Sequence, residues 1–333
     1  MTEPIRWGVL GAANFARDKM APAIHAAKGA ELAALATSSP DKAAGFTAFA
    51  PRMRVLDSYD GLLADPDIDA VYIPLPNHLH IEWTLKALEA GKHVLTEKPL
   101  AMRAEAFDQV IAARDRTGLV AAEAYMIVHH PQWQRARALF QEGAIGRLVH
   151  VDAVFSYDNR ADTANIRNRP ETRGGAIPDI GVYTYGSTRF VTGQEPQEIT
   201  GAHIRWENGV DVFSLVTAQF DGFTGAFVNS MRMAPSQEVT FYGESGSIKL
   251  TAPFNAQVFG EARVELHKSV HGGGAAGAVT VERFPAANHY VLQVEAFGRS
   301  VREGAPYPCP LEFSRGTQAM IDAVFDAAGP RPG

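Results

Sequence analysis

Hydrophobic positions in the first third of the chain follow two alternating patterns. Short apolar runs with the length of buried strands lie at residues 5–10, 31–36, 70–74, 93–96 and 119–122. Segments with a helical repeat lie at residues 15–27, 82–90 and 103–117, and a further helix should begin at Ser39 and Pro40. We expect the first helix to break at Pro22. Strands that alternate with helices predict a doubly wound parallel sheet, the Rossmann architecture.

The pattern changes after about residue 145, where strand-like segments follow one another without helices between them. They lie at residues 148–157, 198–206, 212–220, 225–233, 237–242, 247–251, 263–269 and 279–284. Turn residues such as Asn208-Gly209 and Asp221-Gly222 separate them, which predicts a large, mostly antiparallel open sheet in an α+β domain. We therefore expect a dinucleotide-binding domain at residues 1–123 and a substrate and oligomerisation domain at 124–333. Helical periodicity at 289–302 and 312–328 predicts helices that pack back on the first domain.

Composition excludes several other classes of protein. The chain has 333 residues, a net charge of −6 and a single cysteine, Cys309. A net negative charge argues against nucleic-acid or anionic-membrane binding, and one thiol forms neither an internal disulfide nor a cysteine-rich zinc site. His78, His129 and His130 lack acidic or cysteine partners at ligand spacing, so we expect no metal site. With no export signal or membrane-length apolar run recognised, a cytoplasmic protein is expected.

The first strand ends in a glycine turn that a helix follows. The segment Gly11-Ala-Ala-Asn-Phe-Ala16 matches the G-x-G-x-x-G/A dinucleotide fingerprint, with Ala13 in place of the second glycine. Backbone N–H groups at a helix N-terminus favour a pyrophosphate whatever the side chain. The turn predicts nucleotide binding; the alternative is a tight turn without a ligand.

The end of the second strand bears on the choice between NAD and NADP. No Asp or Glu stands at Ala36-Thr-Ser-Ser39, where a carboxylate would hold the ribose hydroxyls of NAD. Thr37 and Ser38 offer hydrogen bonds to a 2′-phosphate, and Lys42 offers a positive charge. This pattern favours NADP(H).

Two further motifs carry groups suited to hydride-transfer chemistry. Lys98 follows the strand at 93–96, so it is directed toward the crevice beyond the carboxyl ends of the strands, unless the Lys98-Pro99 pair is only a surface turn. Asp179 and Tyr183 are four residues apart on an expected helix and share one face. A phenol exchanges a proton with a carbonyl or hydroxyl group, and a nearby ammonium lowers its pKa. The alternative is a surface acid and a packed tyrosine.

Together these motifs resemble the Gfo/Idh/MocA oxidoreductase family. The resemblance rests on the turn at Gly11, the run from Asp69 to His80, the segment Gly91–Pro99 and the sequence Asp179-Ile-Gly-Val-Tyr183, in that order. Many members of the family have histidine where this chain has Tyr183. The tyrosine makes the chain similar to the subgroup of glucose–fructose oxidoreductase, NADP-dependent xylose-type dehydrogenases and dimeric dihydrodiol dehydrogenase.

The resemblance implies roles for individual residues. Lys98, Tyr183 and Asp179 are the expected catalytic residues, and the same three with Arg167 are expected to bind substrate. Arg167 lies in a loop before a glycine turn, where the alternative is a surface ion pair. The expected cofactor-binding residues are Gly11, Ala13, Asn14, Phe15, Thr37, Ser38, Lys42, Pro76, Asn77, His80, Glu97 and Lys98. The open sheet implies a homodimer or homotetramer.

The sequence thus predicts an NADP(H)-dependent dehydrogenase or reductase acting on a sugar or polyol-like carbonyl. In this hypothesis Tyr183 transfers the proton, Lys98 lowers the pKa of Tyr183 and polarises the substrate oxygen, and Asp179 orients a hydroxyl group. Three alternatives stay open: a transhydrogenating sugar oxidoreductase with tightly bound cofactor, a nucleotide-sensing regulator without turnover, and an NAD-assisted glycoside-cleaving enzyme.

Overall fold

The computed structural model describes residues 3–269 and 277–329, and these divide into two compact units. The first unit contains the residues up to His129 together with Asn288–Arg315. The second contains His130–Ala287 and the residues from Gly316 onward. Among the described residues, the helices are all too short or too polar to span a bilayer.

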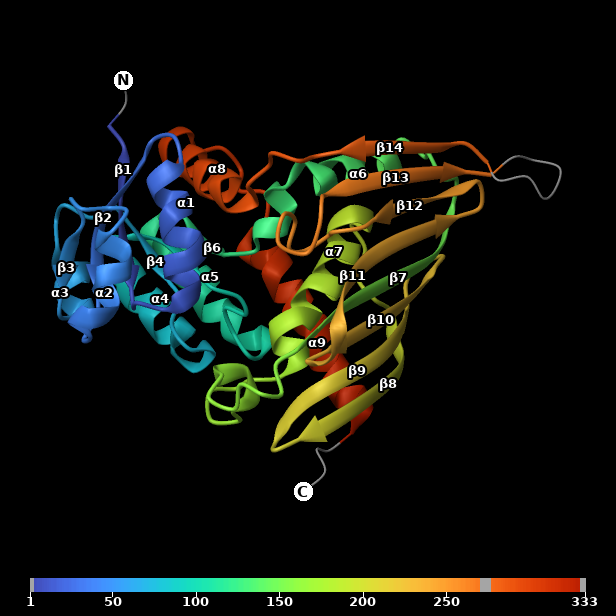
Figure 1. Cartoon of the computed structure of the whole chain (residues 1–333), viewed down its shortest axis with the longest axis horizontal. Coiled ribbons are helices and arrows are strands. Elements are labelled where there is room, and N and C mark those ends of the chain that lie inside the picture. Colours follow the sequence, from blue (N-terminus) through green and yellow to red (C-terminus); the bar gives the residue numbers. More distant parts are fainter. Residues whose placement is uncertain (1–2, 270–276, 330–333) are drawn as a thin grey trace. The chain divides into compact units, whose positions relative to one another are not determined.

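A six-stranded parallel sheet forms the centre of the first unit, with the strand order β3-β2-β1-β4-β5-β6 (Figure 1). The chain leaves β1 toward β2 and β3, then returns to the other side of β1 to form β4, β5 and β6. This confirms the doubly wound parallel sheet expected from the sequence, and it creates a switch point between β1 and β4. The strands are β1 Ile5–Leu10, β2 Ala30–Ala36, β3 Arg54–Leu56, β4 Ala70–Ile73, β5 His93–Thr96 and β6 Ala121–Glu123.

Helices cover both faces of this sheet, as expected when the strands are apolar on both sides. One cluster of buried apolar side chains joins β1 and β2 to α1 (Ala21–Ala26), α2 (Pro40–Thr47) and α8 (His289–Glu303). The other cluster joins the sheet to α3 (Tyr59–Ala64), α4 (His80–Glu89) and α5 (Phe107–Thr117). Segments far apart in the sequence meet where Phe297 of α8 packs on Trp7 of β1, with ring centroids 5.0 Å apart.

An eight-stranded sheet dominates the second unit, in the order β14-β13-β12-β11-β7-β10-β9-β8. All of its neighbouring strands are antiparallel except β7 and β10, which run parallel. The mostly antiparallel sheet predicted from the sequence is therefore confirmed. The strands are β7 Leu148–Asp158, β8 Glu198–Glu207, β9 Val210–Gln219, β10 Thr224–Ser230, β11 Arg232–Gly243, β12 Gly246–Leu250, β13 Arg263–Lys268 and β14 Val279–Arg283.

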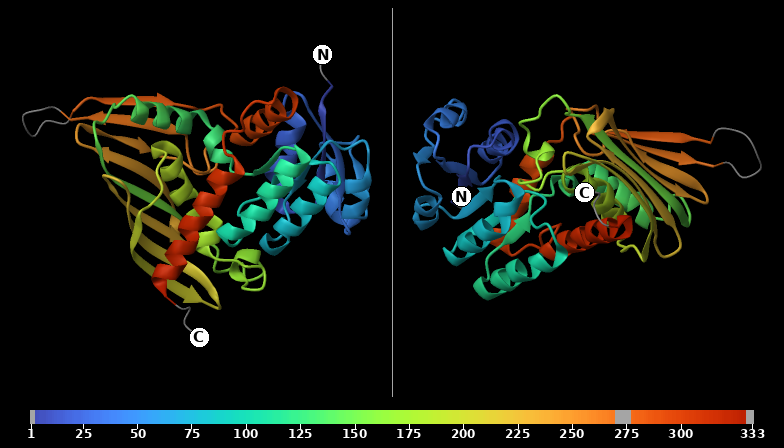
Figure 2. Two further views of the ribbon diagram at one scale, coloured as in Figure 1. Left: turned by 180° about the vertical axis from the view of Figure 1, so that it is seen from behind. Right: turned by 90° about the horizontal axis from the view of Figure 1, so that it is seen from below.

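Within the second unit, helices pack on one face of the sheet (Figure 2). They are α6 (Pro131–Gln141), α7 (Val182–Thr192) and the part of α9 (Leu311–Ala328) that belongs to this unit. Every residue of α7 from Val182 to Val191 is buried. A helix buried on all sides is held in a fixed place, which matters because α7 carries Tyr183.

The local sequence patterns were misleading at three places. The first helix does not break at Pro22: a π-helical segment at Ala16–Met20 leads into α1, and Pro22 sits in the first turn of α1, where its missing N–H costs nothing. The expected strand at 225–233 is two strands, because β10 ends at Ser230 and β11 starts at Arg232. The short elements β3 and α3 have no strong sequence pattern and were not expected.

The contact between Trp7 and Phe297 predicts a stability effect. Phe297→Ala should lower the free energy of unfolding by about 3–5 kcal/mol, because it leaves a cavity against a buried indole. Chemical denaturation would measure it, with Val55→Ala on an exposed strand position as the control, expected to change stability by no more than ~0.5 kcal/mol. A loss below about 1 kcal/mol for Phe297→Ala would contradict the importance of this contact.

Candidate functional site

The glycine turn after β1 has the conformation that a dinucleotide turn needs. Gly11 has a φ of 107°, and a Cβ atom there would lie 3.0 Å from Leu75 and 3.2 Å from the Tyr59 hydroxyl. Helical structure begins just beyond it: Ala13 is half-buried, Asn14 is exposed, and Phe15 packs edge-on against Tyr290. Strand, turn and helix therefore fit a pyrophosphate at the predicted position.

The end of β2 presents hydroxyl groups and a cation but no carboxylate. The Thr37 side chain is buried and accepts a hydrogen bond from the Ser39 N–H at 3.2 Å, which fixes the turn. Ser38 and Lys42 are exposed. Asp41, the nearest acid in sequence, lies in the first turn of α2. The exposed Ser38 and Lys42 are groups that could hold a phosphate on a cofactor ribose.

Glu97 and Lys98 follow β5 at the carboxyl end of the sheet. The Glu97 carboxylate accepts a hydrogen bond of 2.6 Å from the Tyr72 hydroxyl of β4. Withdrawal from water raises the pKa of Glu97 to about 7, against the opposing effects of the Tyr72 hydrogen bond and the Lys98 charge. Glu97 is thus poised to change charge near neutral pH, directly beside the predicted catalytic lysine.

Two buried side chains hold the segment that follows Lys98, where the Lys98–Pro99 peptide bond is cis. The ring nitrogens of His80 lie 2.8 Å from the Pro99 carbonyl oxygen and 2.7 Å from that of Leu75. The Leu100 N–H donates to the buried Glu123 carboxylate at 2.8 Å. His80 is only 1% exposed, so this geometry favours a role in shaping the turn over direct contact with a nucleotide. The predicted residues Pro76 and Asn77 form the start of a 3₁₀ turn between β4 and α4.

In the second unit, Asp179 receives two donors on a single oxygen. Its Oδ2 accepts a hydrogen bond of 2.6 Å from the Tyr157 hydroxyl and lies 2.8 Å from Nε of Arg167. The charge of Asp179 raises the pKa of Arg167, and burial together with that charge raises the pKa of Tyr157 well above its usual value. Tyr157 therefore stays protonated and donates its hydrogen to Asp179, which also pairs with Arg167.

Tyr183 lies beside this cluster, at the start of α7. Its side chain is 6% exposed, and its ring packs against Phe155 and Phe254 with centroids 5.7 Å away in each case. The phenol also contributes to the raised pKa of Arg167, so the two groups are close enough to interact electrostatically. The predicted Arg167, Asp179 and Tyr183 thus belong to one cluster.

Asp211 of β9 caps the segment that carries Asp179. It accepts a hydrogen bond of 2.6 Å from the Ile177 N–H, and burial raises its pKa to about 7. Gly175 has a φ of 135°, and a Cβ atom there would collide with the Asp211 carboxylate. Residues 177–181 form a π-helical turn, so Asp179 and Tyr183 are not spaced by a regular α-helical turn as expected.

Sequence reasoning missed three polar residues of these clusters: Tyr72, Tyr157 and Asp211. For Tyr157 a signal exists. It lies two residues after Phe155 on β7, so both side chains point to the same face of the sheet, the face on which α7 packs. For Asp211 the signal is an acid between Val210 and Val212 in a buried strand. Among the described residues, the structure contains no group of three or more metal-ligating side chains.

Comparison with protein families gives two matches along the chain. Residues 5–125 match the model of an oxidoreductase family with an NAD-binding Rossmann fold, and residues 133–249 match the GFO/IDH/MocA C-terminal domain. An uncharacterized oxidoreductase from Rhizobium meliloti is 38% identical over 97% of each chain. A dTDP-3,4-didehydro-2,6-dideoxy-α-D-glucose 3-reductase from Saccharopolyspora spinosa is 37% identical, over 99% of this chain and 98% of its own.

The fold is similar to that of a 3-ketoreductase from Actinomadura kijaniata, solved in complex with NADP and TDP-benzene. That structure is 30% identical, has a TM-score of 0.88 and is matched over 98% of each chain. A D-xylose 1-dehydrogenase (NADP⁺) from Haloferax volcanii is 30% identical over 97% of each chain.

The environment of Glu97 predicts how stability depends on pH in the nucleotide-free protein. The folded state keeps the Glu97 proton up to about pH 7, whereas the unfolded chain releases it near the ordinary pKa of 4.5. Between these values the unfolded state binds fewer protons, so unfolding becomes easier as the pH rises. Relative to Glu97→Gln, the wild type should lose up to ~3 kcal/mol of stability between pH 4.5 and 8, as measured by urea denaturation.

The Gln variant serves as the control, because it keeps an acceptor for Tyr72 and does not titrate. Parallel stability curves for wild type and Glu97→Gln across this pH range would show that Glu97 ionises normally and would contradict a raised pKa in the folded state.

Proposed function

Because the chain belongs to the Gfo/Idh/MocA oxidoreductase family, we propose that it is an NADP(H)-dependent reductase or dehydrogenase acting on a carbonyl or hydroxyl carbon of a sugar. The observation that carries the proposal is the cluster at the start of α7, in which Arg167 pairs with the Asp179 carboxylate and the buried phenol of Tyr183 interacts electrostatically with the same arginine. A phenol placed in this way suits proton exchange with an oxygen atom that gains or loses charge during hydride transfer.

The residues of the first unit support NADP(H) as the cofactor. Gly11 permits the tight turn, and the exposed Ser38 and Lys42 meet no competing carboxylate at the end of β2. The A. kijaniata ketoreductase was solved with NADP, and the H. volcanii dehydrogenase is named for NADP⁺. Lys42 would balance the charge of the 2′-phosphate.

In this proposal, the turn at Gly11 together with Ser38 and Lys42 would hold NADPH, which would supply the hydride for the carbonyl carbon of the substrate. Tyr183 gives its phenolic proton to the carbonyl oxygen, so that the carbonyl group becomes a CH–OH group, and solvent returns a proton to the phenolate. Arg167 stabilises the phenolate that remains, and Lys98 polarises the same substrate oxygen. Asp179, held in place by Tyr157 and Arg167, accepts a hydrogen bond from a substrate hydroxyl group.

This assignment changes the expected role of Arg167. The sequence leaves open a substrate contact or an ion pair. In the structure Arg167 forms the ion pair, but with the functional Asp179 rather than with a surface acid. We therefore assign it to the charge balance of Tyr183 and Asp179.

The substrate class follows from the same groups and from the relatives. A carbonyl next to a hydroxyl group matches the paired donors and acceptors at Tyr183 and Asp179. Two reductases of dTDP-linked keto sugars match this chain over at least 96% of either chain, at 37% and 32% identity, and a xylose dehydrogenase does so at 30%. We propose a keto sugar, free or linked to a nucleotide, as the oxidised substrate.

The face of the eight-stranded sheet that points away from α7 supports the proposed homodimer or homotetramer. Leu215 of β9 and Tyr242 of β11 are exposed there, at 43% and 41%. His150 of β7 stacks on Tyr242, which extends the exposed surface to a third strand. Large apolar side chains exposed on an open sheet face are typical of an association surface.

Replacing the phenol tests the chemistry. Tyr183→Phe should lower kcat by about 10²–10⁴-fold, because it removes the proton while keeping the packing against Phe155 and Phe254. Tyr185→Phe, the same change two residues further along α7, is the matched control and should stay within a few-fold of wild type. Full turnover by Tyr183→Phe would remove Tyr183 from the mechanism.

A substrate screen tests the function itself. Wild-type protein with NADPH and with NADH, supplied with dTDP-linked keto sugars or free keto sugars, and with NADP⁺ and aldoses or polyols, is followed through nicotinamide absorbance. We expect turnover of one sugar class with a lower KM for the NADP(H) form. Cofactor binding without turnover of any of these substrates would favour a nucleotide-sensing protein, and release of a glycoside leaving group would favour glycoside cleavage.

A further inference from the structure

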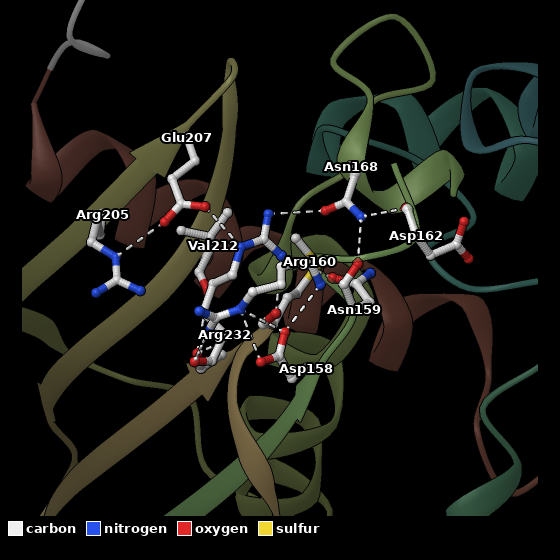
Figure 3. A network of polar contacts seen from close by, with 11 residues as sticks. Asp158, Asn159, Arg160, Asp162, Asn168, Arg205, Glu207, Val212 and Arg232 are labelled. Carbon is white, nitrogen blue, oxygen red and sulfur yellow. Dashed lines mark hydrogen bonds and ion pairs between the residues drawn. The ribbon is translucent and has the colours of Figure 1, made fainter. Parts of the chain in front are cut away.

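Arg232, at the start of β11, is a buried cation that the proposed mechanism does not use. Its side chain is 7% exposed, and Nε lies 2.7 Å from a carboxylate oxygen of Glu207 on β8. The two remaining nitrogens of the guanidinium reach the loop after β7. One donates to Asn159 Oδ1 at 2.9 Å and the other to Asn168 Oδ1 at 3.1 Å (Figure 3).

The loop that Arg232 contacts spans residues 159–173 and is closed on itself by hydrogen bonds. Asn168 donates from Nδ2 to the carbonyl oxygens of Asn159 and Asp162, at 3.1 and 2.9 Å. Thr172 donates from Oγ1 to the carbonyl oxygens of Ile166 and Arg169. Asn168 therefore has two roles, since its amide oxygen binds Arg232 and its amide nitrogen closes the loop.

The same loop carries Arg167 to the candidate site. The N–H of Arg167 donates to Asn165 Oδ1 at 3.0 Å, which fixes the backbone just before Asn168. After Asn168, a Cβ atom at Gly174 would collide with the carbonyl oxygen of Arg167, so only glycine fits at position 174. The direction of the Arg167 side chain, toward Asp179, is thus set by the path of the loop.

An arginine suits this anchoring role better than a lysine would. Its guanidinium is planar and presents five donors in a fixed fork, so one group can bind a strand carboxylate and two loop amides at once. The carbonyl oxygen of Arg232 also accepts a hydrogen bond from Arg160, which lies in the loop and pairs with Asp158. The loop is therefore tied to the sheet both at its start and at Asn168.

We infer that Arg232 is a positioning residue: through Asn159 and Asn168 it holds the loop at residues 159–173 in the shape that places Arg167 against Asp179. The inference deepens the proposed function, on which it rests for its kinetic consequence. In a loop that loses this anchor, the Arg167 side chain should contact Asp179 in a smaller fraction of molecules, which would weaken its electrostatic interaction with Tyr183.

The test uses Asn168→Ala, which removes the contact to Arg232 and the loop closure without touching the core. Glu207→Gln is the matched control, because it removes charge on the sheet side of Arg232 and leaves both loop amides in place. Asn168→Ala should lower kcat/KM by about tenfold or more, and Glu207→Gln should leave it within about threefold. In the Arg167→Gln background, Asn168→Ala should have little further effect, because its consequence runs through Arg167.

Trypsin supplies a readout that needs no turnover. Cleavage sites follow Arg160, Arg167 and Arg173 in the loop, whereas Arg169 precedes Pro170 and is resistant. Native Asn168→Ala should be cut in the loop at least about tenfold faster than wild type and Glu207→Gln, with unchanged thermal unfolding.

Each result decides a separate point. Equal cleavage of wild type and Asn168→Ala would overturn the anchoring by Arg232. Faster cleavage with an unchanged kcat/KM, or with losses that add to those of Arg167→Gln, would overturn its positioning role. A wild type that turns over no sugar contradicts the proposed function instead, and the cleavage rates still decide the anchoring.

Discussion

Two donors share one oxygen of Asp179, and the candidate chemistry of the second unit depends on this arrangement. The Tyr157 hydroxyl and the Arg167 guanidinium both lie within 2.8 Å of Oδ2. A carboxylate bonded in this way is held in one orientation, because losing either donor would leave the largely buried Asp179 side chain with fewer hydrogen bonds. The Arg167 guanidinium also interacts electrostatically with the Tyr183 phenol, so the charge that pairs with Asp179 acts on Tyr183 as well.

Local environment gives three carboxyl groups of the chain different surroundings. Asp179 pairs with the Arg167 guanidinium and accepts a hydrogen bond from Tyr157. Asp211 caps a helical turn from inside the unit and has a pKa of about 7, because burial outweighs the backbone donors around it. Glu97 also has a pKa of about 7, where burial outweighs the nearby Lys98 and the Tyr72 hydroxyl. Such separation of acids by environment is typical of sites that handle protons, and packing rather than residue type produces it.

Much of the fold could be predicted from the sequence, because strand and helix periods are local. The parallel sheet, the mostly antiparallel sheet and membership of the Gfo/Idh/MocA family are confirmed. Contacts between distant segments could not be predicted in the same way. Asp211 on β9 binds the helical turn at 177–181, and Arg232 binds Asn168, which lies 64 positions earlier in the sequence. The assigned roles of Lys98, Asp179 and Tyr183 remain predictions.

The most direct test is a crystal structure of the protein with NADP⁺ and an unreactive analogue of the sugar substrate. We predict that Nζ of Lys98 and the hydroxyl oxygen of Tyr183 both lie within about 3.5 Å of the same analogue oxygen, next to C4 of the nicotinamide. A complex in which either group lies well beyond hydrogen-bonding distance of that oxygen, with the nicotinamide in place, would contradict the proposed proton transfer.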